Sequence, residues 1–145
     1  MTQKEKQTVS DTDRSAYRCF TRVELRYGDT DRQGHINNAV YCTLFESGRC
    51  EFLYENGQFI SGPGRAFVIV KLTLDYLSEM NYPGTCEIGS KILSLGKSSM
   101  VVGQAIFKDG VCSSTAESII VLTDESTRKS TPLTDEIIEK LKPYM

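Results

Sequence analysis

The sequence predicts an α+β fold in which a mainly antiparallel sheet packs against one long helix. Three observations support this: an alternating apolar and polar segment near the N-terminus, one segment with helical spacing of apolar residues, and four later strand-like segments separated by turn residues. A chain of 145 residues has room for one domain with one core. We expect residues 17–145 to form that domain.

Residues 1–16 are polar and carry both charges, so we expect a disordered tail that cannot bury enough apolar surface to offset its ordering entropy. From residue 17 the pattern changes, and apolar residues come to alternate with charged ones. This period predicts a strand with one buried face, ending at Gly28. The alternating apolar positions are Val23, Leu25 and Tyr27.

The next segment has the spacing of a helix, with apolar positions at Tyr41, Phe45 and Phe52. Asn37 is a suitable N-cap, because its side-chain oxygen can accept a hydrogen bond from an unpaired backbone N–H. Gly57 is a suitable stop. Gly48 lies inside the predicted helix, where glycine is costly unless another group must approach the backbone closely.

Four strands are predicted after the turn SGPGR, and the first of them alternates apolar and polar residues. Asp109-Gly110 favours a tight hairpin between the last two. Leu133-Thr134-Asp135 then precedes a short C-terminal helix. One helix cannot cover a sheet of this size completely, so we expect an exposed edge and association with another copy. The predicted strands span residues 68–76, 86–95, 99–107 and 111–122.

Composition excludes several classes of function. The chain has 17 basic and 19 acidic residues and a formal net charge of −2, which argues against a nucleic-acid partner. Its five cysteines are widely separated without a C-x-x-C pair, so we expect reduced core thiols, no disulfide framework and no metal site. The sequence has neither a leader pattern nor an apolar run long enough to span a membrane. We expect a cytoplasmic protein without a membrane partner.

The densest group of polar residues lies between the first strand and the helix, from Arg26 to Tyr41. A helix N-terminus can polarise a carbonyl oxygen, and a nearby carboxylate can attack that carbonyl or activate water. Asp29, Asp31 and His35 could supply this chemistry. Spacing alone leaves turn and cap chemistry equally open for the two aspartates. A calcium loop is disfavoured, because Val40 occupies the position of its bidentate glutamate.

The run RYGDTDRQGHINNAVYCTLFESGR, Arg26 to Arg49, closely resembles the first motif of the 4-hydroxybenzoyl-CoA thioesterase family of hotdog proteins. Weaker similarity extends over roughly Tyr17 to Leu141. The resemblance implies a hotdog fold, in which an antiparallel five-stranded sheet wraps around one long helix, with a short C-terminal helix. It also implies hydrolysis of an acyl-CoA to free acid and CoA without a metal or cofactor.

Carried over residue by residue, the resemblance makes Asp31 the nucleophile or general base. The backbone amide of Asn38 would bind the thioester oxygen, and Asn37 would shape that turn beside the substrate. His35 and Tyr27 would line the site. Asp29 would have a supporting role, and Glu46 is a reserve candidate for the carboxylate.

The nucleotide end of CoA carries phosphate charges, which lysine or arginine can pair with in water. Lys97, with the neighbouring Ser98, matches a basic position of the family, whereas Arg128 and Lys129 match by location only. All three basic residues could instead be ordinary solvated charges. The G-H-I-N-N version of the motif favours an aliphatic acyl group over an aromatic one.

The resemblance further implies a homodimer or a dimer of dimers, a homotetramer, with each site between subunits. Two alternatives remain. One is a hotdog module that binds acyl-CoA without hydrolysing it, and the other is an enoyl-CoA hydratase or dehydratase. Release of free thiol would separate the enzyme from the binding module, and hydration of an enoyl-CoA would reveal the third activity.

Overall fold

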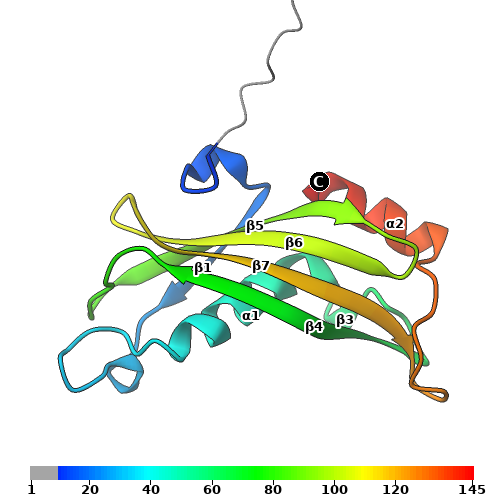
Figure 1. The fold of residues 1–145 in the computed structure, drawn as a ribbon, viewed down its shortest axis with the longest axis horizontal. Helices are drawn as coiled ribbons and strands as arrows, with labels where there is room; N and C mark the ends of the chain where they lie inside the picture. Colours follow the sequence, from blue (N-terminus) through cyan, green and yellow to red (C-terminus); the bar gives the residue numbers. More distant parts are fainter. Residues whose placement is uncertain (1–9) are drawn as a thin grey trace, which may run out of the picture.

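The computed structural model describes residues 10–145 (Figure 1). A five-stranded sheet and a long helix, α1, form most of the chain, with a two-stranded hairpin and a short helix, α2, at one end. The α+β arrangement predicted from the sequence, a hotdog fold, is confirmed. Its elements are β1 (Cys19–Glu24), α1 (Val40–Leu53), β2 (Tyr54–Glu55), β3 (Gln58–Phe59), β4 (Arg65–Tyr76), β5 (Thr85–Leu95), β6 (Ser99–Lys108), β7 (Val111–Asp124) and α2 (Asp135–Leu141).

The strands of the main sheet lie in the order β1-β5-β6-β7-β4, and every neighbouring pair is antiparallel. β1 and β4 are therefore the two edges. The Lys108 to Val111 turn between β6 and β7 is a tight hairpin with positive φ at Asp109 and Gly110, as the Asp-Gly pair predicted.

The core lies between one face of the sheet and α1, because alternate residues of each inner strand point toward the helix. One buried cluster, with Phe45, Ile88 and Ile106, lies under the N-terminal half of α1. A second cluster, with Phe52, Met100 and Leu122, lies under its C-terminal end, and α2 closes the core there through Ile137 and Leu141. Thr134 caps α2 by accepting a hydrogen bond from the Ile137 N–H at 3.2 Å.

Both predicted ends of the long helix need correction. α1 ends at Leu53, and Gly57 lies with Asn56 at the tip of the β2–β3 hairpin, where both have positive φ. The helix N-cap is Ala39. Asn37 stands two residues earlier, where its side-chain oxygen accepts a hydrogen bond from the Ala39 N–H at 3.0 Å.

A bulge in β4 changes the predicted apolar face of that strand. Pairing with β7 shifts between Ile69 and Lys71, so strict alternation from Val68 to Tyr76 is interrupted. Val68 and Val70 are exposed rather than in the core. Because β4 is an edge strand, the bulge leaves these apolar side chains on the rim of the sheet.

The N-terminal segment extends the ordered structure further than the sequence indicated. The part of the predicted tail at residues 1–9 lies outside the described residues. The short 3-10 helix η1 (Arg14–Ala16) packs on the sheet face opposite α1, where Tyr17 lies over Gly89. Arg14 pairs with Glu87 at 2.8 Å, which helps to hold this segment on β5.

The cysteines are free among residues 10–145, and only Cys86 is fully buried. Cys42 and Cys50 are exposed on α1, so the expectation of core thiols holds only in part. Across residues 10–145, none of the helices combines the length and apolar character needed to cross a membrane.

Candidate active site

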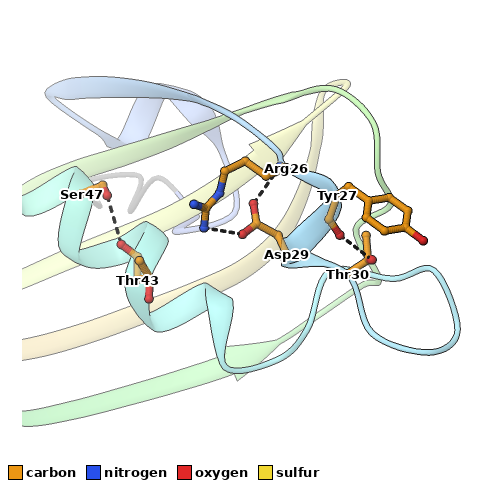
Figure 2. Close-up of polar contacts among 6 residues, drawn as sticks. All are labelled: Arg26, Tyr27, Asp29, Thr30, Thr43 and Ser47. Carbon is orange, nitrogen blue, oxygen red and sulfur yellow. Dashed lines mark hydrogen bonds and ion pairs between the residues drawn. The ribbon is translucent and has the colours of Figure 1, made fainter.

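The first aspartate of the motif organises the loop before α1. Tyr27 to Asp29 form a short 3-10 helix, and the Asp29 carboxylate folds back to accept hydrogen bonds from the backbone N–H of Arg26 at 2.8 Å and its guanidinium at 2.9 Å (Figure 2). Asp29 is only 4% exposed. The hydrogen bond from the Arg26 side chain lowers the pKa of Asp29 below its ordinary value. Asp29 is therefore a structural residue.

The second aspartate has a different environment. The Asp31 Oδ1 atom accepts hydrogen bonds from the backbone N–H groups of Gln33 at 2.8 Å and His35 at 3.2 Å. Gly34 has a φ of +81°, which allows this tight loop to close. Within residues 10–145, the Oδ2 atom of Asp31 has no hydrogen-bond partner. A fixed carboxylate with one free oxygen can accept a proton or attack a carbonyl carbon.

The connection between β4 and β5 supplies the second wall of the site. The Ile36 N–H donates to the Met80 carbonyl at 2.8 Å. The backbones of His35 and Asn81 pair in an isolated antiparallel β-bridge. The side chain of His35 reaches Glu79, with 3.2 Å between Nε2 and Oε2. This pairing holds the Asp31 loop against residues that come more than forty positions later.

The start of α1 supplies backbone donors. Asn37 donates its backbone N–H to the Asp29 carbonyl at 2.8 Å, which fixes the turn into the helix. The Tyr76 hydroxyl donates to the Asn38 carbonyl at 2.7 Å, tying the end of β4 to this turn. In the part of the chain that the structure describes, the Asn38 backbone N–H is not used in a hydrogen bond. It stands at the positive end of a 14-residue helix.

These groups line one cavity of about 590 Å³. Tyr41 and Tyr76 pack edge to face in its wall with ring centroids 5.2 Å apart, and burial raises the pKa of Tyr41. An unpaired carboxylate oxygen and an unpaired amide donor in one cavity suit acyl transfer, in which a carbonyl oxygen gains negative charge. The lining residues are Asp31, Gln33, His35, Ile36, Asn37, Asn38, Tyr41, Tyr76, Leu77, Ser78 and Glu79.

The structure brings four of the predicted site residues together: Asp31, His35, Asn37 and Asn38. Tyr27, expected to line the site, lies outside this cavity. Its side chain is 79% exposed and packs edge to face against Tyr82, because the 3-10 helix directs it away from α1 (Figure 2).

The predicted CoA-binding residues lie at the other end of the sheet. Lys97 and Ser98 form the turn between β5 and β6, and the Lys97 carbonyl accepts from the Leu133 N–H at 2.8 Å. Arg128 and Lys129 follow the end of β7 nearby. Tyr76 pairs with Ser114 near the opposite end of β7, roughly 30 Å away at the usual rise per strand residue. One chain alone does not bring them to the cavity.

Tyr41, Tyr76 and Glu79 also line the cavity, although the sequence analysis did not place them in the site. Tyr41 stands one helical turn after Asn37 inside the motif, and this spacing could have indicated it. Tyr76 and Glu79 carry no local signal, since only the pairing of the β4–β5 connection with the Asp31 loop brings them close.

Comparisons with known proteins identify the family of the chain. A family model described as Thioesterase-like superfamily matches residues 25–141. Acyl-CoA thioester hydrolase YbgC of Escherichia coli O6:H1 is 28% identical over 124 residues, which cover 83% of this chain and 92% of that protein. Long-chain acyl-CoA thioesterase FadM of Escherichia coli K12 is 27% identical over 126 residues, with 84% and 96% covered.

A solved structure is similar over most of the chain. The structure of a predicted thioesterase from Bacillus stearothermophilus superposes with a TM-score of 0.78 at 26% identity, covering 87% of this chain and 95% of that one.

Proposed function

The chain belongs to the thioesterase-like superfamily and is a thioester hydrolase, and from this premise we propose that it hydrolyses an acyl-CoA to a free acid and CoA. The observation that carries the proposal is that Asp31 and Asn38 line one cavity, where the Asp31 Oδ2 atom and the Asn38 N–H have no hydrogen-bond partner among the residues that the structure describes. The names of YbgC and FadM support acyl-CoA as the substrate class.

In the proposed reaction, the Asn38 N–H binds the thioester carbonyl oxygen and stabilises its negative charge as the tetrahedral intermediate forms. Asp31 takes a proton from the attacking water, the carbon–sulfur bond breaks with its electron pair on sulfur, and the thiolate takes up the proton. Alternatively, Asp31 attacks the carbonyl itself, the carbon–sulfur bond breaks to release the CoA thiolate, and water then hydrolyses the resulting anhydride, supplying the proton for the thiolate. Both routes give the same products and need no cofactor.

The test is a thiol-release assay on purified protein with a panel of acyl-CoAs. We expect turnover, with aliphatic acyl groups preferred over aromatic ones. Binding of acyl-CoA without thiol release would instead indicate a non-catalytic module. Hydration of an enoyl-CoA without thiol release would indicate a hydratase.

We also propose that the protein is a homodimer at minimum and a homotetramer as the larger assembly. The support is β4, an edge strand of 12 residues that pairs on only one side within residues 10–145. Its exposed apolar side chains include Val68, Val70 and Tyr76. A long, apolar, unpaired edge is a template for pairing with a second copy.

Such pairing would also explain the distant basic residues. If two copies of β4 ran antiparallel about a two-fold axis, the Arg65 end of one would lie beside the Tyr76 end of the other. Lys97 of the partner subunit would then approach the cavity, together with the partner's Arg128 and the partner's Lys129. We propose that these residues hold the nucleotide end of CoA, with Ser98 as a further polar contact.

We propose a cytoplasmic location, where free cysteines remain reduced.

A further inference from the structure

The chain has a single histidine, His35, and its imidazole lies in the cavity with Asp31. The backbone of His35 is fixed from two sides. Its N–H donates to the Asp31 side chain at 3.2 Å, and its carbonyl accepts from the Asp31 N–H at 2.8 Å. The ring therefore extends from a rigid loop, and only its side-chain torsions and protonation remain to be set.

Glu79 is the group that contacts this ring, with 3.2 Å between Glu79 Oε2 and His35 Nε2. The two segments are already joined, because the Ile36 N–H donates to the Met80 carbonyl at 2.8 Å. The contact therefore joins residues that flank a backbone hydrogen bond. It is not a chance meeting of two long surface side chains.

A neutral imidazole carries its proton on one of its two nitrogens, and the charged or polar group beside each nitrogen decides which. The Glu79 carboxylate, 3.2 Å from Nε2, repels a lone pair on that nitrogen, so it favours the proton on Nε2 and the lone pair on Nδ1. We propose that Glu79 is a positioning residue, which orients His35 and leaves Nδ1 as a proton acceptor in the cavity. The catalytic part of this proposal rests on the proposed thioester hydrolysis.

Of the titratable groups around the His35 ring, Glu79 is the one that contacts the imidazole. The titratable groups that line the cavity around the ring are Asp31, Glu79, Tyr41 and Tyr76. Asp31 engages the loop backbone through Oδ1, and Tyr76 donates to the Asn38 carbonyl. Tyr41 packs against the Tyr76 ring. Glu79 is largely exposed, so its contact with His35 should contribute little to the stability of the fold.

The kinetic test is a double-mutant cycle with Glu79→Ala and His35→Ala. We expect Glu79→Ala to lower kcat roughly fivefold to tenfold with KM nearly unchanged, a fraction of what a positioned acid or base supplies. In the His35→Ala background the same change should have no further effect. Glu79→Gln should restore part of the loss, because its amide oxygen can still place a partial negative charge beside Nε2. Glu117→Ala, which removes an exposed acid of β7, is the matched control.

Equal losses from Glu79→Ala in both backgrounds would overturn the proposal, as would no loss in the wild-type background. A second readout does not depend on activity. Nitrogen-15 NMR of the only imidazole should show Nδ1 unprotonated in the neutral wild type and a larger Nδ1–H population in Glu79→Ala. An unchanged tautomer ratio would disprove the positioning role. Absence of thiol release by the wild type would contradict the proposed function alone.

Discussion

Two aspartates only two positions apart are used in opposite ways. Asp29 is buried, and its carboxylate accepts hydrogen bonds from the backbone and side chain of Arg26, so it stabilises the turn. Asp31 is exposed to the cavity and uses only one oxygen for its loop. A carboxylate whose acceptor sites are already occupied is a poor base or nucleophile, so the geometry favours Asp31 for chemistry.

Asp31→Asn should lower the rate of thioester hydrolysis by at least ~10²-fold, since it keeps the shape of the side chain but removes the basic oxygen. A thiol-release assay measures the loss, and circular dichroism checks that the fold is retained. Near wild-type turnover in Asp31→Asn would contradict the assignment. Asp29→Asn is the matched control and should reduce turnover less.

Asp29→Asn should instead reduce the free energy of unfolding by about 1–3 kcal/mol at neutral pH, because it weakens a charged hydrogen-bonded pair. Arg26 holds the pKa of Asp29 below its ordinary value of 3.8 in the folded state, so the ionised pair stabilises the fold above that pH. The contribution is lost as pH falls through the lower, folded-state pKa. Urea denaturation of both proteins at pH 7 and pH 3 should show the difference shrinking; a constant difference would be inconsistent with this pair.

At the scale of the elements, α1 lies close against the sheet because of one glycine. A Cβ atom on Gly48 would stand 2.5 Å from Ile88 Cγ2 and 2.8 Å from Gln104 Nε2. Gln104 is fully buried, and its amide donates to the Phe45 carbonyl and the Ser90 hydroxyl at 2.9 Å each. The sheet therefore touches the helix backbone directly, and this is the close approach that a glycine inside a helix had suggested.

Gly48→Ala should consequently destabilise the protein by about 1–3 kcal/mol, although alanine is favoured in helices by roughly 1 kcal/mol. Overpacking against Ile88 outweighs the gain in propensity. Thr43→Ala is the control, since Thr43 is exposed on the same helix and contributes its backbone carbonyl to Ser47 (Figure 2). It should be neutral or slightly stabilising. Denaturant unfolding measures both, and a stabilised Gly48→Ala would disprove the packing argument.

Periodicity predicts elements well here, but it does not predict their junctions. The strands β5, β6 and β7 and the body of α1 lie where apolar spacing placed them, because each buries one face. The end of the helix was predicted wrongly, because Gly57, which suggested a helix stop, lies with Asn56 in the β2–β3 hairpin. The motif indicated Asp31 and Asn38 as candidates, and both line the cavity, but Glu79 reaches the cavity only through tertiary pairing, which no local pattern contains.

At the scale of the whole molecule, the exposed rim of β4 predicts self-association. Val70 is 59% exposed on this edge strand, and Val68 is also exposed. We expect light scattering at micromolar concentration to give at least twice the chain mass of 16.2 kDa. Replacing Val68 and Val70 together with lysine should yield a folded monomer, because edge charges block strand pairing. A monomeric wild type would contradict this interface.

The last prediction concerns Lys97, which lies roughly 30 Å along the sheet from the cavity of its own chain. If a two-fold axis at β4 brings Lys97 of the partner subunit to the CoA phosphates, Lys97→Ala should raise KM for acyl-CoA with little change in kcat. The contact would be exposed, so the effect should be modest and should weaken with added salt.

A truncated acyl-pantetheine substrate separates this role from a general loss of affinity, because it lacks the nucleotide phosphates. Its KM should be unchanged by Lys97→Ala, and equal weakening for both substrates would mean that Lys97 does not touch the nucleotide. Lys142→Ala is the control, since Lys142 is exposed and follows α2 in the C-terminal 3-10 helix. In the variant with lysine at both Val68 and Val70, Lys97→Ala should no longer raise KM for acyl-CoA, because a monomer cannot supply Lys97 to the site of a second subunit.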